Sequence, residues 1–236
     1  MTTIQARLQI VQARVSAAAR AVGRDPAQVT LLAVSKTFDP QAVAEACAAG
    51  QTAFGENYLQ EALPKIAALR HLRLQWHCIG AVQSNKTRAV AENFDWVHTV
   101  DRLRIAQRLS QQRPAHLKPL QVCIQVNADA GATKSGVPPH EALLLAQQVA
   151  SLPRLCLRGI MSIPEPAPDF VSQCAVFARV KSVFDALRAQ GLALDTLSMG
   201  MSADLEAAIH CGSTLVRVGT AIFGQRVNAA AAGLSS

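Results

Sequence analysis

Aromatic residues are scarce in this chain: they make up 4% of its 236 residues, and tyrosine occurs once. Platforms for stacking nucleic-acid bases are therefore few. Long apolar runs are also missing, since none reaches the roughly 18 residues of a membrane span. Met1–Ala21 is amphipathic and interrupted by arginines, which is unlike a secretion signal. We expect a cytoplasmic protein that does not enter a membrane.

The six cysteines stand singly among apolar neighbours, and no CxxC pair occurs. Because zinc and redox sites are built from such pairs, we expect buried free thiols and no bound metal.

The chain has 23 Lys and Arg against 16 Asp and Glu, a net charge of +7. Such a balance fits either a nucleic-acid surface or an anionic small ligand. The basic residues are spread through predicted helices without interleaved aromatic residues, which favours a solvated surface and no nucleic-acid partner.

Short apolar runs alternate with longer helical patterns, which is typical of a parallel sheet built from βα units. Eight strands are predicted: Leu31–Ser35, Ala53–Gly55, Gln75–Ile79, Trp96–Thr99, Leu120–Val126, Arg158–Ile163, Thr196–Met199 and Leu215–Ile222. Helices are predicted to begin near Pro40, Tyr58, Asn85, Arg102, Pro139, Asp169 and Ala203, and another spans Thr3–Val22. This pattern predicts a single-domain α/β fold, a (β/α)8 TIM barrel with an extra N-terminal helix, over residues 1–227. A flexible tail is predicted at 228–236.

Local signals support several of these helix ends. Pro139 suits a first helical turn, and Asp101 is expected to cap the helix that follows it. Gly50 and Gly191 are expected to end the helices before them, because glycine adopts positive φ freely.

Lys36 directly follows the apolar run Leu31–Ser35, which places an amine at the carboxyl end of the first strand. Barrels of this kind carry their sites at that end. The low dielectric there favours the neutral amine, the species that forms a Schiff base. A lysine at a strand end can equally extend its ammonium into water, and this alternative stays open.

The segment Leu197–Glu206 runs from the seventh strand through Gly200 into a predicted helix whose first turn offers Ser202. The unpaired N–H groups of a helix start and the helix dipole together bind phosphate. An ordinary helix cap by Ser202 is the alternative interpretation.

The predicted last strand carries Arg217, Gly219 and Thr220. Gly219 lets a ligand approach the backbone, and Thr220 adds a hydroxyl. Phosphate sites in TIM barrels frequently use the loops after strands seven and eight, which hold Ser202 and these two residues. Arg217 is predicted to share a face with Gly219, and its guanidinium is a donor that cannot be deprotonated. The lysine, the phosphate cradle and the arginine together predict a pocket for pyridoxal 5′-phosphate (PLP).

Four groups of motifs resemble the pyridoxal phosphate homeostasis proteins, the YggS/PROSC family. The motifs are Ala33–Thr37, Phe54–Tyr58, Trp76–Gly80 with Gln83–Lys86, and Leu197–Asp204 with Arg217–Gly224. The resemblance implies that Lys36 holds PLP as a Schiff base and that Ser202, Gly219 and Thr220 hold its phosphate. It also implies that Arg217 faces the pyridine nitrogen and that Asn57 lines the pocket. The family is regarded as a carrier or buffer of PLP, which implies that apo-enzymes accept it, and we expect a monomer.

The barrel of that family is related to the N-terminal domain of alanine racemases, so a fold-type III racemase or lyase is the alternative function. A two-base racemase needs a second acid/base group, supplied in those enzymes by a tyrosine reached through another domain. The chain ends 12 residues after Gly224 (236 − 224), so no such domain is expected, and its one tyrosine is Tyr58. An arginine at the pyridine nitrogen disfavours ring protonation and weakens the electron sink. No dedicated catalytic activity and no catalytic residue are therefore predicted.

Two histidines and one glutamate invite other interpretations. His77 and His98 are expected to be hydrogen-bonded structural histidines, because no carboxylate stands at metal-ligand spacing from them. Glu56, next to Asn57, is expected to pair with a cation such as Lys86.

Overall fold

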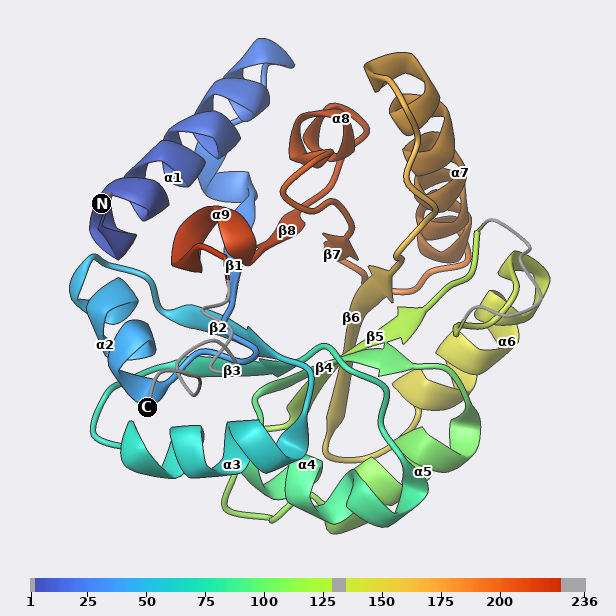
Figure 1. Cartoon of the computed structure of the whole chain (residues 1–236). Helices are drawn as coiled ribbons and strands as arrows, with labels where there is room; N and C mark the ends of the chain where they lie inside the picture. The colour runs from blue at the N-terminus through green and yellow to red at the C-terminus, as the bar shows by residue number, and fades with distance from the viewer. Residues whose placement is uncertain (1–2, 129–134, 226–236) are drawn as a thin grey trace, which may run out of the picture.

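Eight parallel strands close into a barrel in the order β1 to β8, and helices surround it (Figure 1). The computed structural model describes residues 3–128 and 135–225. The strands are β1 Thr30–Val34, β2 Ala53–Glu56, β3 Gln75–Cys78, β4 Trp96–Val100, β5 Leu120–Gln125, β6 Leu155–Met161, β7 Thr196–Ser198 and β8 Leu215–Val218. The predicted (β/α)8 barrel is thereby confirmed, and the predicted tail at 228–236 lies outside the described residues.

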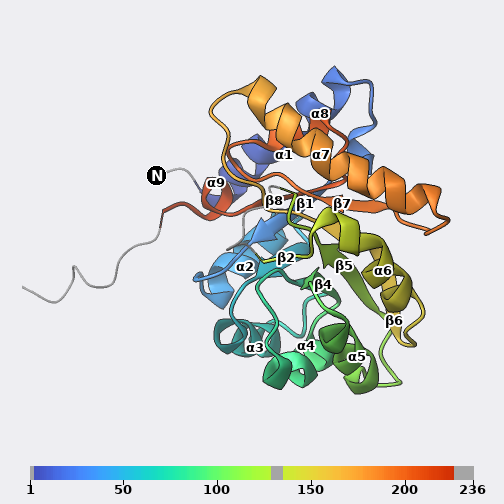
Figure 2. The same cartoon turned by 90° about the vertical axis from the view of Figure 1, so that its right-hand side faces the viewer.

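The α-helices are α1 Ile4–Ala21, α2 Pro40–Ala48, α3 Leu59–Ala68, α4 Thr87–Asn93, α5 Leu103–Gln112, α6 Pro139–Ala150, α7 Phe170–Ala189, α8 Leu205–His210 and α9 Thr220–Phe223. Two 3-10 helices are η1 Pro26–Gln28 and η2 Ser84–Lys86. Helices α1, α7 and α8 lie on one side of the barrel, and α3, α4 and α5 lie on the opposite side (Figure 2). In the described residues, no helix is both long enough and apolar enough to cross a membrane.

Strand pairing brings the first and the last strand of the barrel together. The barrel closes where β1 pairs with β8, with Leu32 opposite Arg217 and Ala33 opposite Val218. Because the strands are parallel, the segments that follow them emerge at the same end of the barrel. Lys36 and the Gly219–Thr220 pair therefore become neighbours although they are far apart in sequence.

The core consists of strand side chains packed against the inner faces of the helices, and large buried examples are Phe54, Leu120, Ile160 and Leu197. Removing these apolar side chains from water supplies the main driving force for closing the barrel.

The N-terminal helix α1 packs on the last two helices, α8 and α9. It buries Leu8, Val11 and Val15 at helical spacing, and Thr3 caps its first turn. The Nε of Arg7 in α1 donates to the carbonyl oxygen of Ile222 in α9, over 2.7 Å. The extra helix thus holds the segments that follow β7 and β8.

Several predicted boundaries were wrong. The last strand was predicted to continue to Ile222, but β8 ends at Val218 because Gly219 turns the chain and its carbonyl accepts from the N–H groups of Ile222 and Phe223. Strand β6 begins at Leu155 rather than Arg158, since Leu155 already pairs with Leu120.

Two helix starts also differ from prediction. Helix α8 begins at Leu205, so Ser202 lies in the turn before the helix rather than in its first turn. Asp101 does not cap α5; Arg102 is the N-cap residue, without a side-chain cap bond, and the Asp101 carboxylate lies 3.7 Å from its Nε. Gly50 and Gly191 do have positive φ after α2 and α7, as predicted.

Candidate functional site

A hollow of about 420 Å³ opens at the carboxyl end of β1 and β8. Its size is that of a pocket for a small molecule. The residues that line it are Val34, Lys36, Thr37, Phe38, Gly219, Thr220, Gly224 and Gln225. Three of the predicted site residues, Lys36, Gly219 and Thr220, therefore meet in one place.

Lys36 is half-buried, and the turn after it is fixed by two hydrogen bonds. The N–H of Thr37 donates to Glu61 Oε2 over 2.8 Å, and the N–H of Phe38 donates to the carbonyl oxygen of Ser35 over 3.1 Å. Thr37 has φ +68°, a left-handed conformation that costs an ordinary residue on the order of 1 kcal/mol. Such backbone strain is typical of segments that position a functional group.

A buried ion pair contacts Ser35, the residue before Lys36. The Nζ of Lys65 is 2.6 Å from Glu56 Oε1 and donates to the carbonyl oxygen of Ser35 over 2.8 Å. The Ser35 hydroxyl donates to the same glutamate oxygen over 2.6 Å. Glu56 does pair with a cation, as expected, but Lys86 was the wrong example, because Lys65 on α3 reaches Glu56 through the core.

Burial raises the pKa of Glu56, while the bonds from Lys65 and Ser35 oppose this rise. Its Oε2 is buried and has no hydrogen-bond partner within the described part of the chain. The charge on Glu56 therefore depends on Lys65. The two side chains together fix Ser35, the residue before Lys36, since Lys65 bonds its carbonyl oxygen and Glu56 bonds its hydroxyl.

The turn from β8 into α9 offers free backbone donors. The N–H groups of Gly219, Thr220 and Ala221 have no recorded acceptor among residues 3–128 and 135–225. A Cβ at Gly219 would lie 3.2 Å from the carbonyl oxygen of Val34, so a side chain there would crowd β1. Free N–H groups beside a glycine can donate hydrogen bonds to the oxygens of an anion.

Ser202 occupies the turn between β7 and α8 and does not line the hollow around Lys36. The predicted alternative, a cap by Ser202, was wrong, since the N-cap residue of α8 is Asp204. The Arg14 guanidinium in α1 donates to the Ser202 carbonyl oxygen over 3.1 Å and to both Glu206 carboxylate oxygens. The turn is therefore fixed from α1.

Gly200, at the start of this turn, must be glycine. Its φ is +95°, and a Cβ there would lie 2.4 Å from the Cβ of Ala208. This close approach lets the chain leave β7 and enter α8.

Arg217 is buried inside the barrel. Its Nη1 donates to the carbonyl oxygen and the hydroxyl of Ser198, over 2.9 and 2.7 Å, and its Nη2 donates to the carbonyl oxygen of Ser162 over 2.9 Å. Burial lowers the pKa of Arg217 to about 10, although Asp204 and Cys123 oppose the shift. The side chain stays charged at neutral pH, and two of its five N–H donors have no recorded partner in the described residues.

Asn57 follows β2 and lies against Gly80, where a Cβ would be only 2.1 Å from the Asn57 carbonyl oxygen. The side-chain Oδ1 of Asn57 is buried and lacks a partner among the described residues. A buried amide oxygen without a partner is costly, so a donor from a ligand would satisfy it. Asn57 does not line the hollow around Lys36.

His77 and His98 are hydrogen-bonded inside the barrel, as expected for structural histidines. The Nδ1 of His77 lies 2.9 Å from the Nε2 of His98, and the Nδ1 of His98 lies 3.0 Å from the hydroxyl of Ser198. Sequence reasoning missed this connection to Arg217. The alternation of inward-facing positions in β3, β4 and β7 was the available signal.

Comparison with known proteins gives three consistent findings. Residues 7–227 match the family described as alanine racemase, N-terminal domain. The pyridoxal phosphate homeostasis protein of Pseudomonas aeruginosa is 59% identical over 226 residues, covering 96% of this chain and 97% of that protein. The protein of that name from Escherichia coli strain K12 is 53% identical over 229 residues, covering 96% and 98%.

Among solved structures, PipY of Synechococcus elongatus with PLP bound superposes with a TM-score of 0.82. It is 36% identical in sequence, and the match covers 94% of this chain and 100% of PipY.

Proposed function

Since this chain belongs to the family of pyridoxal phosphate homeostasis proteins, built on the alanine racemase N-terminal barrel, we propose that it binds PLP and serves PLP homeostasis. The observation that carries the proposal is the meeting of Lys36 with Gly219 and Thr220 in one hollow of suitable size. The PLP bound by PipY supports the same ligand.

The residues of this chain suit the three functional groups of PLP, which are its aldehyde, its phosphate and its pyridine nitrogen. When bound, PLP supplies an aldehyde that condenses with a primary amine and releases water. Lys36 offers that amine in the hollow. The free N–H groups of Gly219 and Thr220, the Thr220 hydroxyl and the turn at Ser202 are proposed to hold the phosphate.

Arg217 and Asn57 complete the proposed site. The two remaining N–H donors of Arg217 suit the pyridine nitrogen, which is an acceptor when unprotonated. The unsatisfied Oδ1 of Asn57 is proposed to accept from the ligand or from water that the ligand orders. We propose that Lys36 holds PLP as a Schiff base within these contacts.

The charge on Arg217 favours a protein that holds PLP over one that catalyses a reaction with it. Its pKa of about 10 keeps the guanidinium protonated at neutral pH, so it does not give a proton to the pyridine ring. An unprotonated ring withdraws electrons weakly, which disfavours carbanion chemistry at the bound group. We therefore propose no dedicated catalytic activity; exchange of amino-acid α-protons with solvent far above the rate of free PLP would favour a racemase or lyase instead.

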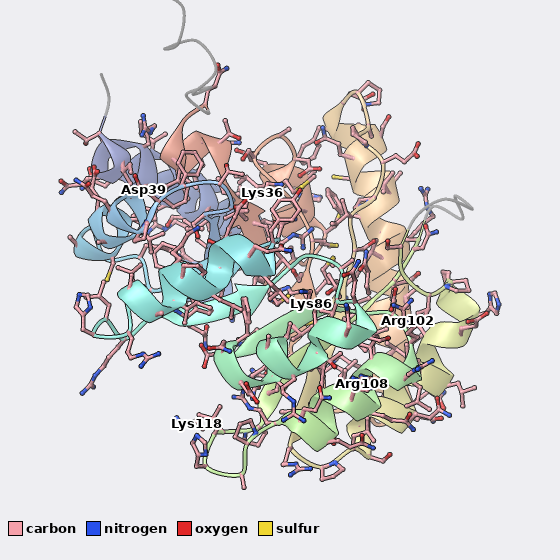
Figure 3. All side chains as sticks on the ribbon, turned by 60° about the horizontal axis from the view of Figure 1, so that its bottom comes forward. Lys36, Asp39, Lys86, Arg102, Arg108 and Lys118 are labelled. Carbon is pink, nitrogen blue, oxygen red and sulfur yellow. The ribbon has the colours of Figure 1, made fainter. Side chains whose placement is uncertain are left out.

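The test is a visible-absorbance titration of PLP-free protein with PLP. Wild-type protein should turn yellow with saturation at one equivalent, and Lys36→Ala should not. Lys118→Ala is the matched control, because Lys118 precedes β5 at the opposite end of the barrel from Lys36 (Figure 3). Equal colour in Lys36→Ala and Lys118→Ala, or a colourless wild type, would overturn the proposal.

We also propose that the protein acts in the cytoplasm as a monomer and passes PLP to apo-enzymes. The six free cysteines suit a reducing compartment, and the barrel that the described strands close leaves none of them with a free edge to pair with another copy. Sedimentation velocity tests the monomer, and recovery of activity by a PLP-free acceptor enzyme mixed with the loaded protein tests the transfer.

A further inference from the structure

A line of polar side chains crosses the interior of the barrel and ends on Arg217. It starts at Gln75, whose Oε1 lies 3.0 Å from the Nε2 of His77, and continues through His98 and Ser198. The Ser198 hydroxyl then meets Arg217 Nη1 over 2.7 Å. Because β5 and β6 lie between β4 and β7, the contact from His98 to Ser198 spans the barrel rather than joining neighbouring strands (Figure 1).

The direction of every hydrogen bond in this line follows from Arg217. A guanidinium only donates, so the Ser198 oxygen accepts from it. The Ser198 hydroxyl then donates to His98 Nδ1, which leaves the proton of His98 on Nε2. His98 Nε2 donates to His77 Nδ1, and His77 Nε2 donates to Gln75 Oε1.

Reversing donor and acceptor in each of these hydrogen bonds leaves groups of the same line unpaired. The Ser198 oxygen would accept twice, and its hydrogen would have no acceptor in the described residues. The Gln75 amide would also have to be turned over to donate. Of the two directions, only the first gives each of these hydrogen bonds a donor and an acceptor without leaving the Ser198 hydrogen unpaired within the described residues.

Burial keeps both imidazoles in the neutral form that this line needs. His77 and His98 are 1% and 0% exposed, and Trp96 stacks on His77 with ring centroids 5.2 Å apart. Burial lowers the pKa of His77 to about 3 and that of His98 well below its usual value, where His77 and Arg217 add to the effect. Each ring nitrogen therefore has one fixed role.

We propose that His77 and His98 are positioning residues that act through Ser198 to fix the Arg217 guanidinium against the pyridine nitrogen of bound PLP. This inference rests on the proposed PLP binding. The line of bonds turns the Ser198 oxygen toward Arg217 as an acceptor, and cooperative polarisation along the line strengthens that contact. Both Nη1 hydrogens are thereby used, which leaves the two unpartnered donors of Arg217 for the ring nitrogen.

The first test needs no PLP. Nitrogen-15 NMR of histidine-labelled, PLP-free protein should show His77 and His98 as neutral rings that carry their protons on Nε2, unchanged down to about pH 5. Assignment of either proton to Nδ1, or protonation of either ring near neutral pH, would overturn the inference even where PLP binds to Lys36.

The second test follows the ring nitrogen of labelled PLP in the loaded protein. Ser198→Ala cuts the line but keeps the Ser198 carbonyl bond to Arg217. Ser110→Ala is the matched control, because Ser110 is a buried serine on α5 whose hydroxyl donates to the Pro153 carbonyl oxygen outside the line. On acidification, the ring nitrogen signal of Ser198→Ala should move further toward the protonated form than that of wild type, and PLP binding should be about fivefold weaker, the effect of losing one hydrogen bond. Ser110→Ala should match wild type.

Two variants of His98 separate positioning from packing. His98→Asn keeps an acceptor for the Ser198 hydroxyl and should restore the wild-type ring nitrogen signal, whereas His98→Phe should resemble Ser198→Ala. A ring nitrogen signal that is the same in wild type, Ser198→Ala and His98→Phe would overturn the inference, while PLP binding in those proteins would leave the proposed function standing.

Discussion

Replacing Lys65 with methionine should destabilise the protein strongly, because it leaves the Glu56 carboxylate buried without its cation. The two side chains are 3% and 0% exposed, and the Lys65 Nζ lies 2.6 Å from Glu56 Oε1. Breaking such a pair from one side costs about 3–5 kcal/mol. For a chain of this size that corresponds to a fall in melting temperature of about 6–20 °C.

The loss of stability in Lys65→Met should depend on pH. Burial raises the folded-state pKa of Glu56, and Lys65 opposes the rise, so Lys65→Met should raise this pKa further. A carboxyl group with a raised folded-state pKa destabilises the fold above that pKa and ceases to do so once both states are protonated. The deficit should therefore be largest at neutral pH and shrink on acidification.

Urea unfolding of the PLP-free protein measures the effect, with two comparisons. Lys181→Met removes a pair with Asp185 of the same 2.6 Å length but with side chains 37% and 50% exposed, and should cost less than about 1 kcal/mol. The double variant Lys65→Met with Glu56→Gln should regain most of the lost stability, since no buried charge remains unpaired. A loss in Lys65→Met no larger than in Lys181→Met, or a double variant as unstable as the single one, would refute this reasoning.

Three further predictions concern the barrel interior and the hollow. The free energy of unfolding should fall as pH drops below about 6.5, because burial lowers the folded-state pKa of His77 to about 3. At about pH 5 this histidine alone lowers the free energy of unfolding by ~2 kcal/mol, and in urea unfolding His77→Gln should show a weaker dependence of stability on pH. Gly219→Val should weaken PLP binding at least about tenfold in absorbance titrations, since its side chain crowds Val34 and enters the hollow; binding within twofold of wild type would contradict this. Arg217→Met should destabilise the fold by about 2–4 kcal/mol in urea, because the Ser198 and Ser162 carbonyl groups lose a charged donor; an unchanged midpoint would contradict it.

The barrel itself could be predicted because its signal is periodic and local. Apolar runs such as Leu120–Gln125 alternate with amphipathic helices, and this alternation leaves few arrangements for a parallel sheet. The end of β8 could not be predicted, because apolar residues continue through Ile222 and only the turn at Gly219 separates β8 from α9.

The co-location of three candidate residues could be predicted from the sequence, because each of them stands at or just after the end of a strand. Lys36, Gly219 and Thr220 do meet in one hollow. The partner of Glu56 could not be predicted, because Lys65 reads in sequence as an ordinary helix lysine and only the packing of α3 buries it. The hydrogen bonds from His98 through Ser198 to Arg217 could not be predicted for a similar reason, since they depend on which side chains face each other across the closed barrel.

Borohydride reduction of the PLP-loaded protein, followed by peptide mass mapping, tests the central claim most directly. Reduction fixes a Schiff base as a stable amine on the lysine that formed it. The account predicts one phosphopyridoxyl group on the peptide that contains Lys36 and none on the peptide that contains Lys118. Modification of another lysine in preference to Lys36, or no modification of protein that carries PLP, would contradict it.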